Sequence, residues 1–283
     1  MSSPSPAPLL RCKGHTLDLS RPLVMGVLNV TPDSFSDGGR FAGPAQAIEA
    51  GLRLAHEGAA LLDIGGESTR PGAAEVSATE ELRRVVPVIE GLRGRSAALL
   101  SVDTSKPEVM TAAAEAGAVL INDVRALGAP GALAAARATG CAVALMHMQG
   151  EPRTMQADPR YEDVVAEVRA FLGARVAAAR AAGFATDELL IDPGFGFGKT
   201  VAHNLTLLRQ LGQLTSLGPA VLVGLSRKSM LGKLTGRDAS ERVYGSVALA
   251  VFAALKGARI IRAHDVAATV DALKVVAALT EGG

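Results

Sequence analysis

The sequence predicts a single α/β domain of the (β/α)8 TIM barrel class, with a short hairpin before the barrel. Short apolar runs alternate eight times with polar loops and amphipathic helical segments, and no linker-like stretch divides the chain into halves. The 283 residues also suit one barrel of about 250 residues. A doubly wound open sheet is the alternative that the same alternation allows.

The eight apolar runs have the length of strands that are buried on both faces, as in a parallel sheet. They are Leu23–Asn29, Ala59–Ile64, Ala97–Val102, Ala118–Ile121, Ala142–Met146, Leu189–Ile191, Ala220–Leu225 and Arg259–Ile261. Before them, segments 9–13 and 16–19 flank Gly14-His15 and predict a hairpin that closes the bottom of the barrel. Residues 1–8 are rich in Ser, Pro and Ala, which predicts a disordered tail and places the domain at 9–283.

Helix signals lie between the runs. Ser77 stands at the start of a capping box, and Pro87 is expected to kink or shorten the helix that follows. The apolar stripe that begins at Val164 is expected to end at Gly183. Asp265 is expected to cap the last helix. The predicted inner face of that helix is Val266, Val270, Leu273 and Ala277.

Composition excludes several classes of function. A formal charge of +1 gives no electrostatic case for binding nucleic acid or an anionic membrane surface. No apolar run is long enough to span a membrane, and residues 1–8 do not resemble a signal peptide. The two cysteines, Cys12 and Cys141, cannot form a disulfide framework, and Cys141 is interpreted as a core residue. A reducing, cytoplasmic location is expected.

The strand ends are unusually polar. The first run ends at Asn29 and continues into a loop with two carboxylates and Phe35. Single features of this kind are common in helix caps and turns, but a barrel brings all its strand ends to one face. The polar ends of the other seven runs are Asp63–Gly72, Asp103–Lys106, Asn122-Asp123, Met146–Met148, Asp192–Lys199, Gly224–Lys228 and Arg262–Asp265.

Three of these residues, Asp103, Asn122 and Asp192, indicate the ligand. Carboxylates accept paired hydrogen bonds from a planar N–H/NH2 edge, and an amide both donates and accepts. Such a set is the complement of an aminopyrimidinone ring, as in a pterin or guanine. Lys228 is expected to donate to ring acceptors, and the guanidinium of Arg262 to stack on the ring and reach an anion.

A second group suits a phosphate. Arg262 and His264 follow the last strand, where many barrels bind phosphate. Asn29 can offer an oxygen to Mg2+, which usually bridges substrate phosphates. The sequence carries neither a Walker loop nor a zinc motif. His147, between two methionines, is interpreted as structural.

These residues lie in blocks that resemble the dihydropteroate synthase family from about Leu9 onward. The matching blocks are Met25–Gly39, Gly65–Gly72, Val102–Pro107, Ile121–Val124, Leu145–Gly150, Ile191–Gly198, Gly224–Gly232 and Arg262–Val266. The resemblance implies a barrel enzyme that condenses 6-hydroxymethyl-7,8-dihydropterin diphosphate with 4-aminobenzoate. The products would be 7,8-dihydropteroate and diphosphate, in folate biosynthesis.

The resemblance also implies roles, carried over position by position. The residues that would hold the pterin are Asp103, Asn122, Asp192, Lys228 and Arg262, with Met146 and Gly224 lining its slot. Those that would bind diphosphate are Asn29, Arg262 and His264, with Asn29 also on Mg2+. Those that would surround 4-aminobenzoate are Ser68, Thr69, Arg70, Pro71, Phe197, Ser226 and Phe35. The expected catalytic set is Asp103, Asn29, Arg262, His264 and Lys228.

The expected mechanism is SN1-like, with diphosphate leaving before the amine attacks and Asp103 offsetting positive charge. Loops 30–40 and 67–74 are expected to close over the acceptor and exclude water. Two alternatives stay open: a pterin-binding methyltransferase domain and a catalytically inactive paralogue. The resemblance suggests a homodimer and sulfonamide competition with 4-aminobenzoate.

Overall fold

The computed structural model describes residues 8–31, 43–68, 75–151 and 154–280. Parallel strands close into a barrel in the order β10-β3-β4-β5-β6-β7-β8-β9, which confirms the predicted barrel and excludes the open sheet. The strands are β3 (Leu23–Asn29), β4 (Leu61–Gly65), β5 (Leu99–Asp103), β6 (Leu120–Asp123), β7 (Ala142–Met146), β8 (Leu189–Asp192), β9 (Ala220–Gly224) and β10 (Ala258–Ala263). Each of the eight predicted runs overlaps one of them.

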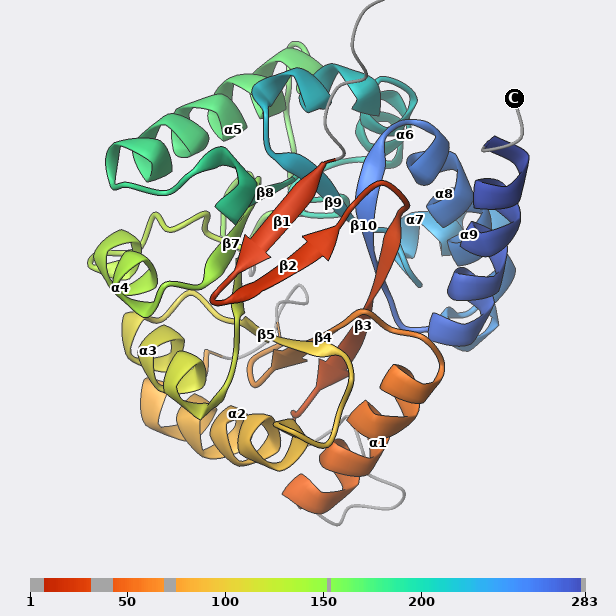
Figure 1. Ribbon diagram of the computed structural model, residues 1–283. Coiled ribbons are helices and arrows are strands. Elements are labelled where there is room, and N and C mark those ends of the chain that lie inside the picture. Colours follow the sequence, from red (N-terminus) through yellow and green to blue (C-terminus); the bar gives the residue numbers. More distant parts are fainter. Residues whose placement is uncertain (1–7, 32–42, 69–74, 152–153, 281–283) are drawn as a thin grey trace, which may run out of the picture.

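Helices surround the barrel on its outer side (Figure 1). They are α1 (Pro44–His56), α2 (Ala78–Leu92), α3 (Pro107–Ala116), α4 (Ala132–Thr139), α5 (Val164–Ala181), α6 (Val201–Arg209), α7 (Ser229–Thr235), α8 (Val243–Leu255) and α9 (Val266–Thr280). Short 3-10 turns complete the connections: η2 (Thr186–Glu188), η3 (Leu211–Leu217) and η4 (Ala239–Glu241). None of the helices within the described ranges has both the length and the apolar character that crossing a bilayer requires.

The predicted N-terminal hairpin is confirmed. Strands β1 (Leu9–Cys12) and β2 (His15–Asp18) pair antiparallel and lie across one end of the barrel (Figure 1). Their buried side chains join the core inside the barrel, so the hairpin closes that end. Of the expected tail at 1–8, all but Pro8 lies outside the described residues.

The helix signals were partly right. Ser77 caps α2, its side chain accepting from the Glu80 amide at 3.3 Å, and α5 ends just before Gly183, whose φ is +95°. Pro87 was expected to kink or shorten its helix; it does not shorten α2, which continues through it to Leu92. Asp265 stands at the predicted cap position directly before α9, and its carbonyl oxygen accepts from the Thr269 amide at 3.1 Å. Its carboxylate accepts from Arg227 at 2.5 and 3.1 Å.

Strand side chains alternate between two separate cores, and this alternation decides which residues can form a site. On β4, Leu61 belongs to the core inside the barrel, whereas Leu62 and Ile64 belong to the core between barrel and helices. Because successive side chains of a strand point to opposite faces, Asp63 must point inward with Leu61. Ala277 was expected on the inner face of α9 but is only partly buried; Val276 is the buried residue in that turn of the helix.

Candidate active site

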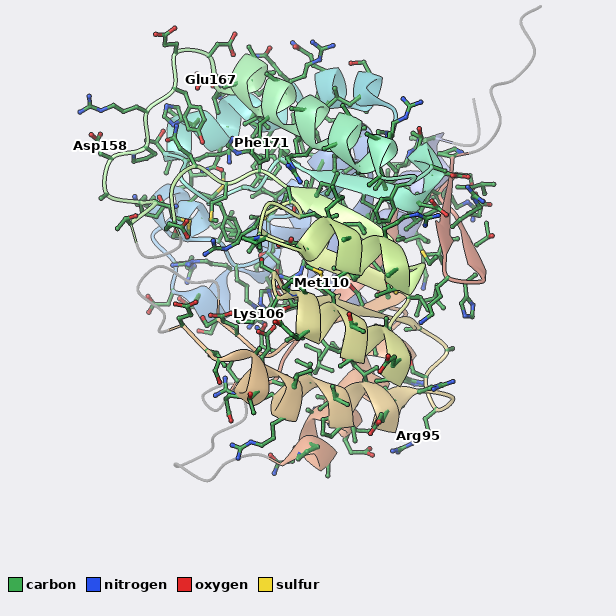
Figure 2. All side chains as sticks on the ribbon, turned by 90° about the vertical axis from the view of Figure 1, so that its left-hand side faces the viewer. Arg95, Lys106, Met110, Asp158, Glu167 and Phe171 are labelled. Carbon is green, nitrogen blue, oxygen red and sulfur yellow. The ribbon has the colours of Figure 1, made fainter. Side chains whose placement is uncertain are left out.

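The strand residues that were predicted to bind the ligand occupy inward-facing positions at the carboxyl ends of the strands. Register places Asn29 beside Gly65, Gly65 beside Asp103, and Asp103 beside Asn122. Met146 is likewise paired with Asp192. The strand ends therefore bring these polar side chains to one end of the barrel, above an apolar interior. Lys106, which follows β5, lies at this end, opposite the hairpin (Figure 2).

A partly buried ion cluster crosses the barrel between β4, β5 and β10. The Nε of Arg262 donates to Asp63 Oδ2 at 2.6 Å, and its Nη2 donates to Asp103 Oδ2 at 3.0 Å. Asp63 is fully buried and also accepts from Ser101 Oγ at 2.6 Å and Asn122 Nδ2 at 2.9 Å. These bonds use two of the five N–H groups of Arg262, so the guanidinium is oriented while others remain for a ligand.

Burial perturbs the acids at this end of the barrel. Desolvation raises the pKa of Asp103 to about 7; the charge of Arg262 opposes the shift, and Asp63 adds to it. Desolvation likewise raises the pKa of Asp192 to about 6, although the Gly194 amide donates to its Oδ1 at 2.7 Å. Carboxylates whose pKa is raised in this way gain most from a ligand that brings N–H donors to them.

Lys228 completes this part of the site. Burial, with the charge of Arg262, lowers the pKa of its ammonium to about 8, while Asp192 and Asp103 oppose that shift. The ammonium lies 4.3 Å from the centre of the Phe197 ring, a cation–π distance. Gly224, next to Arg262 in the register, leaves the wall beside the guanidinium without a side chain. Met146 is buried at the end of β7.

A second group of residues surrounds the ends of β3 and β10. The hydroxyl oxygen of Ser226 accepts from the His264 amide at 3.2 Å and lies 3.1 Å from His264 Nδ1. When the hydroxyl donates to Nδ1, the imidazole carries its proton on Nε2. Burial and the charge of Arg262 lower the pKa of His264 to about 4. A cavity of about 540 Å³ lies between α1 and the first turn of α9; its lining includes Asn29, His264, Arg53 and Glu57 but not Arg262.

The predicted acceptor residues are only partly described. Phe197 and Ser226 lie beside Lys228 and His264 respectively, as given above. Ser68 is partly buried just after β4. Phe35 and Thr69-Arg70-Pro71 lie outside the described residues, together with much of the two loops expected to close over the acceptor.

Sequence reasoning missed two buried groups. Asp63 was noted only as part of its strand, although an acid at an inward position of an apolar strand was a readable signal. The second group is Lys199 with His147: the ammonium lies 2.9 Å from His147 Nδ1, and both side chains are buried. The ring of His147 packs edge-on against Phe171, so its interpretation as structural agrees with its contacts.

A further ion-pair group lies under the β4 and β5 loops. Lys106 donates to Glu67, and to the fully buried Glu81 at 2.6 Å. Glu67 also accepts from the Val76 amide at 3.0 Å. Glu67 thereby holds the two ends of the segment between β4 and α2 together, beside Lys106 in the loop that follows Asp103.

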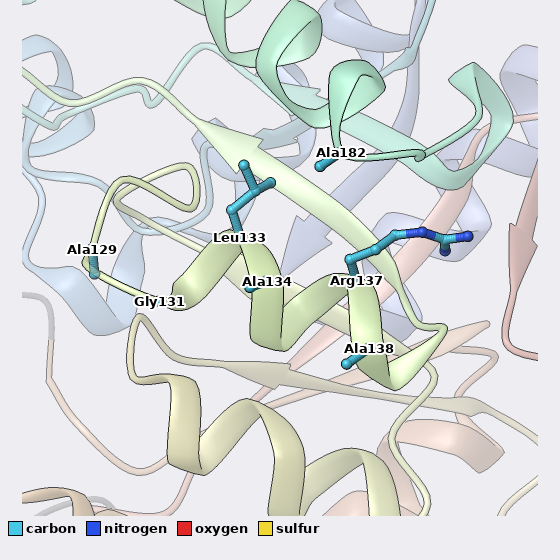
Figure 3. A pocket seen from close by; sticks show the side chains of 7 residues that line it. All are labelled: Ala129, Gly131, Leu133, Ala134, Arg137, Ala138 and Ala182. Atoms are coloured by element: carbon cyan, nitrogen blue, oxygen red, sulfur yellow. The ribbon is translucent and has the colours of Figure 1, made fainter.

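A separate groove lies on the outside of the barrel between α4 and the end of α5 (Figure 3). Its volume is about 580 Å³, and its lining is mainly alanine, with Leu133 and Arg137. Arg137 lies 5.3 Å from the centre of the Phe184 ring. The lining carries no carboxylate or amide side chain that could pair with the N–H edge of a heterocycle. This groove therefore lacks the chemistry gathered at the strand ends.

The barrel and its strand-end groups define an enzyme that binds a flat polar heterocycle beside an anion. Residues 25–264 match the family described as "Pterin binding enzyme". The dihydropteroate synthase of Escherichia coli (strain K12) is 54% identical over 269 residues, covering 95% of each chain. This chain belongs to that pterin-binding family, and within it to the dihydropteroate synthases.

Two solved structures support the assignment. The dihydropteroate synthase of Xanthomonas albilineans, with 4-aminobenzoic acid, has a TM-score of 0.93 and 57% identity, covering 98% of this chain and all (100%) of its own. The Yersinia pestis enzyme, in a sulfonamide drug complex, has a TM-score of 0.93 and 55% identity, covering 97% of this chain and 100% of its own. The barrel and the site residues thus lie inside the shared structure.

Proposed function

We propose that this chain condenses 6-hydroxymethyl-7,8-dihydropterin diphosphate with 4-aminobenzoate, forming 7,8-dihydropteroate and diphosphate. The observation that carries the proposal is the position of Arg262. Its guanidinium is fixed by Asp63 and Asp103, and its charge acts on both Asp192 and His264. One cation is therefore placed to contact both a pterin and its diphosphate.

The pterin is proposed to lie over the strand ends of β5, β6 and β8. Asp192 would accept hydrogen bonds from the N–H/NH2 edge of the ring, and Asn122 would offer its Oδ1, since its Nδ2 is already bonded to Asp63. Lys228 would donate to the ring carbonyl and nitrogen acceptors. Met146 and Gly224 would line the slot, the second leaving room beside Arg262.

Diphosphate is proposed to lie beside Asn29 and His264, where these residues border the cavity between α1 and the first turn of α9. The amides of a helix N-terminus and the N–H groups of Arg262 suit an anion. A neutral His264 donates through Nε2 when Ser226 donates to Nδ1. The incoming anion then favours protonation of this imidazole, whose pKa burial has lowered.

The residues at this end fit Mg2+. Asn29 Oδ1 and Asp103 Oδ2 both lie 3.7 Å from the point that a Cβ on Gly65 would occupy, so two oxygen donors face the same space. Within the described residues no cluster of three His, Cys, Asp or Glu forms a protein-only cage. Mg2+ needs none, because it takes one or two protein oxygens and the substrate phosphates. When bound, the ion neutralises charge on the leaving diphosphate.

The proposed reaction is SN1-like. Arg262 and His264 stabilise the departing diphosphate, and the carboxylate of Asp103 offsets positive charge on the dihydropterin. The neutral amine of 4-aminobenzoate then attacks the exocyclic carbon, with Phe197, Ser226 and Ser68 proposed around the acceptor. Phe35, Thr69, Arg70 and Pro71 are proposed to join them, as the family resemblance implies.

Product formation tests the activity. The purified chain is incubated with Mg2+, the pterin diphosphate and 4-aminobenzoate, and dihydropteroate is measured. Product inhibited competitively by a sulfonamide is expected. Absence of product from folded protein would support an inactive paralogue, and methyl transfer from a methylated pterin to a corrinoid would support the methyltransferase alternative.

Isotope exchange tests the order of bond changes. The oxygen that joins the pterin methylene to diphosphate is labelled, and the enzyme is incubated with this substrate without acceptor. An SN1-like reaction is expected to move the label into non-bridging positions, because diphosphate leaves and returns. A label that stays in place would support direct displacement by the amine.

A homodimer is proposed through α8 and α9, which pack against each other. Helix α8 contains no charged residue, yet Leu255 is 59% exposed and Leu279 on α9 is 78% exposed. Burial of such side chains against a second copy is favourable. Sedimentation velocity is expected to show a dimer that Leu255→Glu dissociates.

Both cysteines are buried and unpaired, which supports a reducing, cytoplasmic location.

A further inference from the structure

The turn between β8 and α6, residues 193–199, encloses a lysine that the mechanism above does not use. Lys199 is only 3% exposed, and its ammonium lies inside the turn. It donates to the carbonyl oxygens of Gly194 and Phe197, both at 3.0 Å. It also lies 2.9 Å from His147 Nδ1, on the segment after β7.

The backbone of the turn explains why a cation is held there. Gly194, Gly196 and Gly198 have φ of +67°, +80° and +61°, in the left-handed region. This conformation lets the Gly194 and Phe197 carbonyls converge on one point and brings the turn against the segment after β7. A Cβ on Gly194 would lie 1.9 Å from the His147 carbonyl oxygen. The Gly194 carbonyl also accepts from the Phe197 amide at 3.1 Å, and Lys199 adds a donor from inside the turn to both carbonyls.

The charges around Lys199 agree with this arrangement. Burial and the nearby charge of Lys199 lower the pKa of His147 to about 3, so the imidazole is neutral and its Nδ1 can accept a hydrogen bond. Burial lowers the pKa of Lys199 to about 7; the charge of Asp192 opposes the shift, and that of Lys228 adds to it. Lys199 therefore stands close to two residues of the site without contacting the space proposed for the pterin.

We propose that Lys199 is a positioning residue that fixes Asp192 and Phe197 relative to each other. One of its acceptors belongs to Gly194, whose amide orients the Asp192 carboxylate. The other belongs to Phe197, whose ring lies beside the Lys228 ammonium. The proposal rests on the function proposed above, in which Asp192 and Lys228 hold the pterin and Phe197 adjoins the acceptor.

Other side chains hold the outer part of the same turn. Tyr161 donates from its hydroxyl to the Gly198 carbonyl at 2.9 Å, and Asn204 Oδ1 accepts from the Gly196 amide at 2.8 Å. Neither bonds to Gly194 or Phe197. The turn therefore stays attached when Lys199 is replaced, and the bond from the Phe197 amide to the Gly194 carbonyl remains. The Phe197 carbonyl loses the bond from Lys199, so the part of the turn that places Asp192 and Phe197 is expected to loosen.

The test compares Lys199→Met with two controls. Tyr161→Phe removes one hydrogen bond from the same turn, and Lys274→Met removes an exposed lysine from α9. In Lys199→Met, kcat/KM for the pterin diphosphate is expected to fall about 100-fold and KM for 4-aminobenzoate to rise, as small misplacements of substrate-binding groups do. Tyr161→Phe is expected to lose less than about 10-fold. Lys274→Met is expected to match wild type.

A pH profile separates positioning from a loss of folded protein. The cations that act on the Asp192 carboxylate are Lys199, Lys228 and Arg262. On the side of β7, the His147 amide donates to the Asp192 carbonyl, and the imidazole of His147 is neutral. Loss of one cation is expected to move the acidic limb of kcat/KM for the pterin diphosphate to higher pH in Lys199→Met. Lys199→Arg keeps the cation, so its limb is expected to stay in place even if its rate falls. A merely structural role lowers the folded fraction and leaves the limb unmoved.

Wild-type kinetics in Lys199→Met would overturn the proposal, and so would a loss fully explained by the folded fraction measured by circular dichroism. If Lys199→Met does not fold, Lys199→Arg decides: unchanged kinetics for both substrates would overturn the proposal. Calorimetric titration with the pterin diphosphate alone provides a readout independent of turnover. Weaker binding by Lys199→Met than by Tyr161→Phe is expected, whether or not the wild-type chain makes dihydropteroate.

Discussion

Asp63→Asn tests whether the buried carboxylate sets the orientation of Arg262. The substitution keeps the size of the side chain. Its amide oxygen can replace Oδ2 and accept from Arg262 and Asn122, while its NH2 faces Ser101, whose hydroxyl can rotate and accept. The substitution therefore removes the negative charge and leaves a partner for each hydrogen bond.

The magnitude follows from the bond that loses its charge. Hydrogen bonds to charged groups contribute about 1.5–3 kcal/mol and neutral ones about 0.5–1.5 kcal/mol, so the midpoints of these ranges indicate that the fixing of Arg262 weakens by about 1.3 kcal/mol. That difference corresponds to about an 8-fold lower kcat/KM for the pterin diphosphate. Asp63→Ala leaves buried donors unpaired and is expected to lower the free energy of unfolding by about 3–5 kcal/mol.

The assay is diphosphate release at saturating 4-aminobenzoate, with urea unfolding of each variant. Asp187→Asn is the matched control, because Arg11 Nε donates to Asp187 Oδ2 at 2.7 Å in an exposed pair that joins β1 to η2, away from the site. It is expected to leave kcat/KM unchanged. A wild-type rate in Asp63→Asn, or an equal loss in Asp187→Asn, would refute the role given to the Asp63 charge.

Three further predictions concern the acids and the glycine turn. Asp103→Asn is expected to lower kcat about 100-fold while the Kd for the pterin diphosphate, measured by calorimetry, changes little, since the charge acts on the developing cation; a pure affinity loss would contradict this role. The pKa of Asp192 is raised from 3.8 to about 6, so the folded chain binds a proton that the unfolded chain releases, and this contribution to stability is lost as pH rises through that window. Asp192→Asn is therefore expected to unfold at higher urea than wild type at pH above about 7 while binding pterin more weakly; lower stability there would count against a buried charge. Gly194→Ala is expected to cost several kcal/mol in urea unfolding because its Cβ would overlap the His147 carbonyl, whereas Gly140→Ala, at φ +70° with open space, is expected to cost about 1–2 kcal/mol; equal costs would contradict the close approach.

The sequence was sufficient to predict the barrel because buried strands appear as apolar runs and their polar ends stand out. Asn29, Asp103 and Asn122 could be placed together because parallel strands share one carboxyl edge. The pairing of Arg262 with Asp63 could not be predicted, because it joins residues 199 positions apart across the barrel. That bond depends on register and on which face of each strand points inward.

The Asp265 side chain illustrates how a tertiary partner competes with a local rule. Asp265 has the residue type of a helix cap, but Arg227 supplies a charged donor from the neighbouring strand end, and an ion pair forms instead. The burial of Lys199, which follows a glycine-rich segment, was not predicted from the sequence. Its burial comes from the left-handed glycines that fold the turn around it, a conformation that the residue types permit but do not specify.

The structure of the chain with the dihydropterin and diphosphate bound tests the central claim most directly. The account predicts the N–H/NH2 edge of the ring within hydrogen-bonding distance of Asp192 and Asn122, with Arg262 between the ring and the diphosphate. Diphosphate is predicted beside Asn29 and His264. A ring seated away from the strand ends, as in the groove beside Arg137, or one that leaves Arg262 without a contact to either group, would contradict the account.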